Sequence, residues 1–203
     1  MTTKWAVALA ILTAACGKSQ ENGAVLKVQL HSGPQAGLST VSHAKAIAAQ
    51  ILASAGVRVD WMTGKNRPGA VAVADPAVAA DMLEIMLDEG VTTGESGLDV
   101  MGYALPFQSK GVRVHVFMGR IRASYGTYSD VVLGHVLAHE IGHVLEGVAR
   151  HSSSGVLKAQ FSVQDLRCMA IHPAVFAPED VSMIQAHFPA LAAAGTVPGG
   201  GSH

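Results

Sequence analysis

The stretch His139-Glu140-Ile141-Gly142-His143 carries the most specific chemical information in this chain. Its two histidines are four residues apart, so on a helix they lie on one face and can direct two imidazoles at one metal ion. The glutamate is turned about 100° from the first histidine, outside the ligand pair but within reach of a water on that ion. This H-E-x-x-H spacing is typical of zinc sites in which one helix supplies two ligands and a general base.

The sequence around the motif predicts a single helix from Ser129 to Glu146. Thr127 and Asp130 have the spacing of a capping box at its start, and Gly147 stands where a helix ends in a left-handed residue. From Val131 to Leu145, the motif glutamate is the one charged residue apart from the histidines. A buried helix with these polar groups needs partners for them, and a zinc ion would serve. The alternative is a core helix with hydrogen-bonded histidines and a chance glutamate.

The motif and the residues after it resemble the active-site signature of the metzincin zinc metalloproteases, most closely the matrixin type. In that pattern a glycine and then a third histidine followed by serine come after the second histidine. Here these are Gly147, His151 and Ser152. They stand four, eight and nine residues after His143, whereas metzincins place the glycine three and the histidine six residues after it. A looser group of bacterial secreted proteins has this longer spacing, with a His-Ser-x-x-Gly segment that matches residues 151–155.

The resemblance implies a zinc ion held by His139, His143 and His151. It also implies an α+β fold in which a twisted mixed sheet packs with a first helix and a buried active-site helix, before a small helical C-terminal part. Metzincins carry a methionine turn beneath the zinc, and the nearest equivalent position here holds Leu157, with Met169 as an alternative. Leucine could provide the same apolar floor, because that role is one of packing.

Alternating apolar residues and turn residues predict the remaining elements. The expected strands span residues 24–31, 57–61, 82–87, 100–105 and 112–118, with a helix as the alternative for 82–87. The expected helices start at residue 39 or 40 and end at 55, and span 162–169 and 178–187. By resemblance, residues 100–105 or 112–118 form the edge strand that pairs with an extended substrate.

The N-terminus resembles an export signal. Lys4 precedes an apolar run from Trp5 to Ala14 and a small-residue cleavage site, which predicts a signal peptide over residues 1–15. Cys16 follows directly and resembles the acylated residue of a bacterial lipobox, although the leucine stands one place too early. We therefore expect an exported protein that is either released or lipid-anchored through Cys16. Residues 16–23 would form a linker, 24–189 a single domain and 190–203 a flexible Gly/Pro-rich tail.

Composition narrows the range of partners. The 203-residue chain has a net charge of -1 and no basic stripe, so we expect no nucleic-acid partner. Contact with a membrane is expected only through a lipid on Cys16. A peptide or protein substrate and a monomeric state are the remaining expectations.

The favoured chemistry is peptide hydrolysis by a zinc-activated water with Glu140 as general base. Tyr125 or Tyr128, just before the motif helix, or a backbone N–H could stabilise the oxyanion. The alternative is a non-catalytic zinc-bound domain that binds a protein or peptide, but the intact Glu140 argues against it. Zinc-dependent hydrolysis of a non-peptide amide is a further alternative.

Other polar residues near the motif have structural explanations. His135, one turn before His139, is expected to support the site from behind or to pack in the core. His115 is expected to be structural, and Asp130 to act as a helix cap. Glu146 lies about 300° around the helix from His143 and is predicted to face outward.

Overall fold

One five-stranded sheet forms the frame of the computed structural model, which describes residues 25–62, 82–90, 101–105 and 112–194. The strands are β1 (Val25–Ser32), β2 (Arg58–Met62), β3 (Met82–Leu87), β4 (Gly102–Leu105) and β5 (Val112–Val116). They lie in the order β2-β1-β3-β5-β4, and all neighbours are parallel except β4, which runs antiparallel to β5 at one edge. The predicted mixed sheet is confirmed.

Alternating burial identifies the face of the sheet that meets the core. In β3, Leu83, Ile85 and Leu87 are buried while the residues between them are half-buried. This alternation is typical of a strand with one tightly packed face. The strand predicted here is therefore confirmed, and the helix alternative is wrong. Ile85 pairs with Leu30 of β1 and Val114 of β5, so buried side chains from three adjacent strands form one apolar strip.

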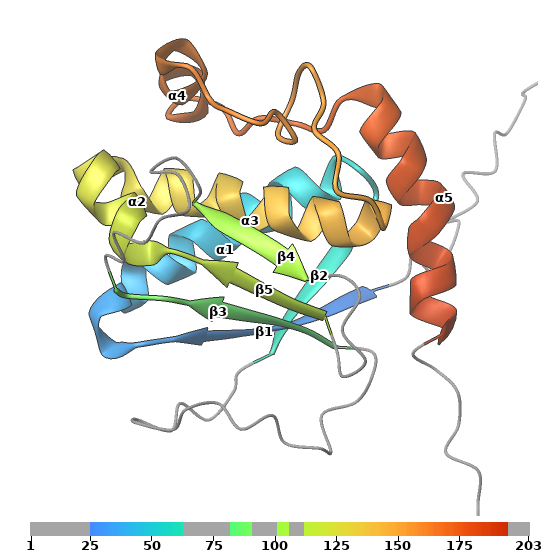
Figure 1. Cartoon of the computed structure of the whole chain (residues 1–203), viewed down its shortest axis with the longest axis horizontal. Coiled ribbons are helices and arrows are strands. Elements are labelled where there is room, and N and C mark those ends of the chain that lie inside the picture. The colour runs from blue at the N-terminus through green and yellow to red at the C-terminus, as the bar shows by residue number, and fades with distance from the viewer. Residues whose placement is uncertain (1–24, 63–81, 91–100, 106–111, 195–203) are drawn as a thin grey trace, which may run out of the picture.

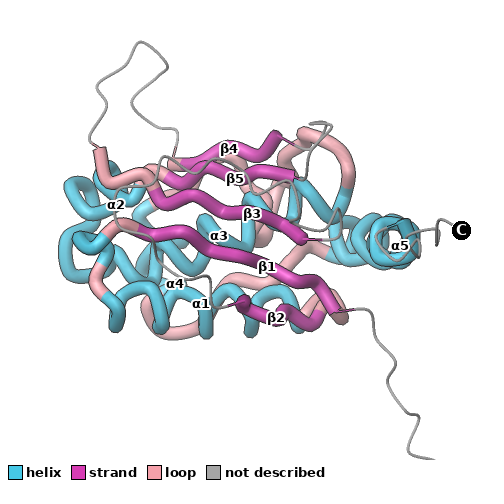
Figure 2. Tube along the Cα trace, turned by 90° about the horizontal axis from the view of Figure 1, so that it is seen from below, coloured by secondary structure: helices cyan, strands magenta, loops and turns pink. Residues whose placement is uncertain are grey.

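Helices cover this face of the sheet. Figure 2 shows the strands in front, with α1 (Leu38–Ala53) and α3 (Ser129–Glu146) side by side behind them. The other helices are α2 (Met118–Tyr125), α4 (Val163–Met169) and α5 (Pro178–Ala194). α5 packs against one end of α3 (Figure 1). No helix in the described part of the chain combines the length and hydropathy needed to cross a membrane.

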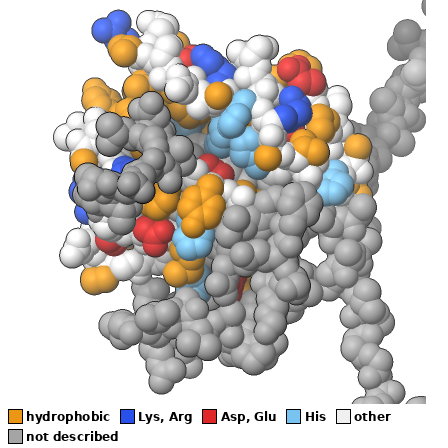
Figure 3. All heavy atoms as spheres, viewed as in Figure 1, with side chains coloured by type: hydrophobic (Ala, Val, Ile, Leu, Met, Phe, Trp, Pro, Cys, Tyr) orange, Lys and Arg blue, Asp and Glu red, His pale blue; other side chains and the backbone are white. Residues whose placement is uncertain are grey.

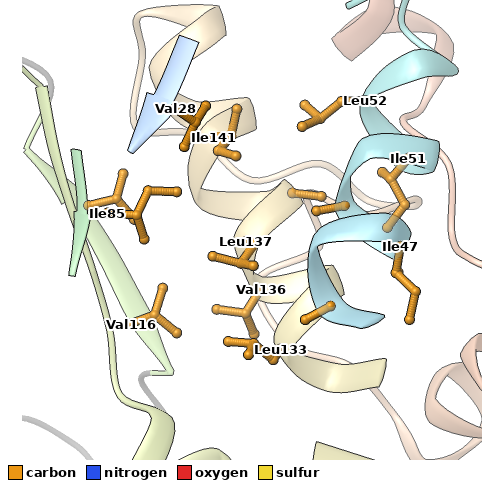
Figure 4. Packing of buried hydrophobic residues seen from close by; sticks show 14 of the residues in the cluster. Val28, Ile47, Ile51, Leu52, Ile85, Val116, Leu133, Val136, Leu137 and Ile141 are labelled. Atoms are coloured by element: carbon orange, nitrogen blue, oxygen red, sulfur yellow. The ribbon is translucent and has the colours of Figure 1, made fainter. Parts of the chain in front are cut away.

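The core lies where α3 packs between the sheet and α1. Figure 4 shows Val28 and Ile85 on the sheet side of α3, and Ile51 of α1 on the opposite side. Leu137 and Ile141 of α3 lie between them and are fully buried. Each such side chain contributes about 1.5–3 kcal/mol through removal from water. α3 is thus held in place along its whole length, which makes it a rigid platform for the motif.

The start of α3 differs from its prediction. The helix has the predicted bounds, but the N-cap residue Tyr128 and the predicted capping residue Thr127 lie in a 3-10 turn that leads directly into it. No side chain caps the helix there, so the predicted capping box is wrong. Asp130 Oδ1 instead accepts from the Val131 N–H (2.8 Å), and Oδ2 lies 2.7 Å from His43 Nδ1 on α1. A capping residue needs an extended backbone, which the 3-10 turn excludes.

Two other element predictions need correction. The strand predicted to reach residue 118 ends at Val116, and Met118 begins α2, which the sequence did not predict. Met118 and Ile121 are buried one turn apart, and this single apolar pair is too short a signal to identify a helix. The last helix continues to Ala194 rather than ending at 187, and so passes residue 190, where the tail was expected to begin.

α4 shows the capping box that α3 lacks. Ser162 Oγ accepts from the Asp165 N–H, and the Asp165 carboxylate accepts from the Ser162 N–H. The predicted signal peptide (1–15), Cys16 and the linker (16–23) lie outside the described residues, as does the end of the tail from 195.

Candidate metal centre

Two of the predicted ligands come from consecutive turns of α3. His139 Nδ1 lies 2.8 Å from the carbonyl oxygen of Val156. A carbonyl oxygen can only accept, so Nδ1 carries the proton and Nε2 presents its lone pair. His143 Nε2 lies 3.0 Å from His139 Nε2. The two ring nitrogens therefore meet at one point above the helix.

The third predicted ligand reaches this point from the loop after α3. Gly147 ends the helix with φ 68°, a left-handed conformation that lets the chain fold back over the last turn. A Cβ on Gly147 would lie 2.5 Å from the His187 ring, which adds a packing reason for glycine. The loop then brings the His151 ring to 5.4 Å from the His139 ring and 5.0 Å from the His143 ring, measured between centroids.

The donor set fits a zinc ion. His139, His143 and His151 each offer one imidazole nitrogen, and these three nitrogens all lie within 4.8 Å of one another. Burial lowers the pKa of His143 to about 4, and the two neighbouring imidazoles add to the effect. Burial also lowers the pKa of His139. Neutral imidazole is the form that binds metal, and three histidines leave a fourth tetrahedral position for water or substrate.

Glu140 lies beside this cluster and is not part of it. Its side chain is 6% exposed, and burial raises the pKa of its carboxyl to about 8. A cation on the neighbouring imidazoles would lower that pKa again. Gly102 of β4 passes so close that a Cβ there would lie 3.0 Å from Glu140 Oε1 and 2.9 Å from the His115 carbonyl oxygen. The sheet edge and the motif carboxylate are therefore in direct contact.

An open cleft of about 590 Å³ surrounds the histidines. Figure 3 shows histidine side chains gathered on this face of the molecule, with acidic and hydrophobic side chains beside them. Most of the other lining residues are uncharged: Met101, Gly102, Tyr103, Ala104, Tyr125, Val132, Val136, Val148, Ala149, Ala159, Gln160 and Phe161. Lys158 also lines the cleft, with its ammonium 2.6 Å from Asp165 Oδ2.

No protein-family model matches the sequence, and no curated protein sequence matches it. Solved structures do match. A zinc-dependent peptidase from Methanocorpusculum labreanum (strain Z) has 13% identity and a TM-score of 0.53, over 78% of this chain and 99% of that one. Metalloproteinase-II from Bacteroides fragilis has 16% identity and a TM-score of 0.50, over 81% of this chain and 53% of that one. This protein shares its fold with these two enzymes. The chain spans about half of the Bacteroides enzyme, and the likeness does not single out the matrixin type.

Within this fold, β4 is the edge strand next to the histidine cluster. It pairs with β5 on one side and with no other described strand, whereas β5 lies between β3 and β4. Of the two edge candidates, the segment predicted at 100–105 thus occupies the edge, and the one at 112–118 is internal. Residues 101–104 line the cleft.

The segment after the third ligand lies against the motif helix. Leu157 is fully buried, and its Cδ2 lies 2.9 Å from where a Cβ on Gly142 would be. The Val156 carbonyl accepts from His139, and the Leu157 carbonyl accepts from the Ser152 N–H (2.9 Å). This segment therefore contacts both α3, which carries His139, and the loop that carries His151. Met169, the other candidate for the floor, lies at the C-terminal end of α4.

Neighbouring aromatic and histidine residues have distinct environments. Tyr125 lines the cleft, whereas Tyr128 is 60% exposed and does not. His135 is fully buried, where its Nδ1 donates to the Val131 carbonyl and its Nε2 accepts from the Ala174 N–H, so its predicted core placement is confirmed. His115 stacks on the ring of Tyr103 and lies 3.2 Å from Asp88, which supports a structural role.

The prediction that Glu146 faces outward is wrong. This residue is 4% exposed rather than facing outward, because α5 and the loop after α3 cover that side of the helix. Arg150 Nη2 donates to Glu146 Oε1 (3.0 Å) and to Asp180 Oδ1 (2.7 Å). Four-residue spacing indicates an ion pair only within a helix, and Arg150 lies beyond Gly147, where α3 ends, so the spacing did not predict this pair. Asp180 had no sequence signal either, because it is thirty residues further along the chain.

Proposed function

We propose that this chain is a metzincin-like zinc endopeptidase of the matrixin type, with one zinc ion on His139, His143 and His151 and with Glu140 as general base. The convergence of three imidazole nitrogens beside a buried carboxylate, in an open cleft, carries the proposal. Under this proposal, the chain differs from typical metzincins in having eight rather than six residues from the second ligand, His143, to the third, His151.

The chemistry divides between the metal and the protein. A zinc ion on these imidazoles would supply Lewis acidity toward a peptide carbonyl and lower the pKa of a water. Glu140 then takes a proton from the water as the water oxygen attacks the carbonyl carbon. It delivers that proton to the amide nitrogen as the C–N bond breaks. The Val156 carbonyl holds the His139 ring in the tautomer that leaves Nε2 free for the metal.

The cleft supports an extended, apolar peptide as substrate. β4 leaves its outer edge unpaired among the described strands, and a peptide added there would gain backbone hydrogen bonds. Apolar residues from α3, β4 and the loops line most of the cleft, so we propose a preference for uncharged side chains next to the cut bond. Tyr125, which also lines the cleft, is the proposed oxyanion donor.

We also propose that the enzyme is exported and acts as a monomer. The basic Lys4, the apolar run that follows it and the small residues before Cys16 support export, with a lipid on Cys16 as the proposed membrane attachment.

Cleavage of a mixed peptide library tests the proposal. The zinc-loaded protein is compared with Glu140→Ala at equal zinc occupancy, and with Glu179→Ala as a matched control on α5. Cleavage by the wild type and the control but not by Glu140→Ala is the expected result, and the cut sites should follow apolar residues. Zinc binding without cleavage by any of them would favour the non-catalytic binding domain. A wild type that binds no zinc would contradict the proposal altogether.

A further inference from the structure

His151 is held differently from the other two members of the cluster. His139 and His143 belong to α3, and the His139 ring is oriented by the Val156 carbonyl. His151 is exposed and lies in a loop, and its ring has no hydrogen bond with another described residue. Its position must therefore come from the residues on either side of it in the chain.

Both flanking residues, Arg150 and Ser152, are bound to one buried carboxylate. Arg150 Nη2 and Ser152 Oγ both donate to Asp180 Oδ1, and the arginine distance is 2.7 Å. Arg150 Nη1 also donates to Ser152 Oγ at 3.0 Å, so the two residues that flank His151 are bound to each other as well as to Asp180. The Ser152 N–H donates to the Leu157 carbonyl and holds the backbone after His151 against the floor of the site.

The anchor for these contacts is rigid. Asp180 is fully buried in the first turn of α5, where its Oδ2 accepts from the Ala177 N–H at 3.2 Å. On the other side, Arg150 Nη2 reaches Glu146 Oε1 (3.0 Å), and Nε lies 3.1 Å from the Met183 sulfur. One guanidinium thus connects the last turn of α3, the loop and the first turns of α5.

The length of the loop explains why such a connection is needed. Three residues separate His143 from Gly147, and three separate Gly147 from His151. Each spacer is one residue longer than in the metzincin signature, so the loop has more conformations available and its ordering costs more entropy. Glu146 and Arg150 are the last residues of these two spacers, and they bind each other.

We propose that Arg150 is a positioning residue that fixes His151 as the third metal ligand by binding Glu146, Ser152 and Asp180 at once. The inference rests on the proposed zinc site and adds the means by which this chain completes it. The planar guanidinium suits the role because its donors point in fixed directions and can bind several oxygens together. A lysine ammonium would keep the charge but could not reproduce those contacts.

Zinc affinity of Arg150→Lys tests the proposal without relying on activity. It is measured by competition with a chromophoric chelator, beside the visible absorption of the cobalt-substituted protein. Arg167→Lys on the exposed side of α4 is the matched control. We expect Arg150→Lys to bind zinc about 10–100-fold more weakly than wild type and to change the cobalt spectrum, while the control matches wild type in both.

A second comparison separates positioning from general stability. If Arg150 acts through His151, adding Arg150→Lys to His151→Ala should cause no further loss of zinc affinity. Equal losses in both backgrounds would overturn the proposal, as would wild-type affinity and spectrum in Arg150→Lys. If circular dichroism shows Arg150→Lys unfolded, Ser152→Ala replaces it in both comparisons, with the same predictions and a smaller expected loss. Absence of zinc binding by the wild type would refute the zinc site itself, whereas the other contrary outcomes refute only the role of Arg150.

Discussion

The two halves of the metal centre are built on different principles. The helix half, His139, Glu140 and His143, lies on one turn and a half of α3, whose packing between the sheet and α1 fixes it. The loop half, centred on His151, depends on contacts with Asp180, thirty residues away from Arg150. Local helix geometry thus sets two ligands and the base, while long-range packing sets the third ligand. Substitutions in the two halves should therefore have effects of different size.

The largest effect should come from removing a helix ligand. His143→Ala should abolish peptide cleavage and reduce zinc affinity more than His151→Ala does, because the buried His143 is held by the rigid helix whereas His151 is exposed. Chelator competition measures both variants, with the exposed His172→Ala as control. Equal losses of zinc affinity in His143→Ala and His151→Ala would show that the helix half and the loop half contribute alike to zinc binding, contrary to this prediction.

The next effect should come from the base on the same helix. Glu140→Gln keeps the size of the buried side chain but cannot take the proton, so kcat should fall about 10²–10⁴-fold. Zinc affinity should stay close to wild type, because Glu140 is not among the grouped ligands. Steady-state kinetics with a peptide from the library measure the change. A fall in kcat explained by lost zinc would contradict the assignment of Glu140 as the base.

A smaller fall in kcat should follow a substitution in β4 that displaces Glu140. In Gly102→Ala the new Cβ would lie 3.0 Å from Glu140 Oε1, so the carboxylate or β4 must shift. A displacement of about 1 Å in a catalytic group can cost up to about 10²-fold in rate. We expect kcat to fall by this order with unchanged zinc affinity. Glu179→Ala, at an exposed position of α5 away from the cleft, is the control.

The smallest effect should appear in the loop half as a pH dependence of stability. Burial raises the pKa of Glu146 from 4.5 to about 7. Between pH 4.5 and pH 7, Glu146 therefore holds a proton in the folded protein that it has released in the unfolded chain. This contribution to stability is complete below pH 4.5 and is lost as pH rises through 7. Glu146→Gln avoids the loss but weakens the pair with Arg150.

Denaturant unfolding of the metal-free protein checks this prediction. At pH 8, Glu146→Gln should be more stable than wild type by about 1–2 kcal/mol, less than the roughly 3 kcal/mol that the full pKa change represents. At pH 4 the two should be nearly equal, because both side chains are then neutral. A stability difference of the same size at both pH values would mean that Glu146 is not protonated in the folded state.

Much of the fold could be predicted from local patterns. The bounds of α3 agree with the prediction because its apolar content and terminal glycine are local signals, and the alternation in β3 correctly indicated a strand. α2 escaped detection because it has one turn of apolar spacing. The capping box at α3 failed because the preceding residues form a 3-10 turn, which depends on how the chain leaves α2.

The sequence by itself determined the grouping of His139, Glu140 and His143, since a helix places residues four apart on one face whatever surrounds it. Only the tertiary structure decided that β4 is the edge strand against Glu140 and that Glu146 is buried. The same holds for the network around His151. Those features come from the packing of β4 and α5 on α3, which joins residues distant in the chain and leaves no periodic pattern in the sequence.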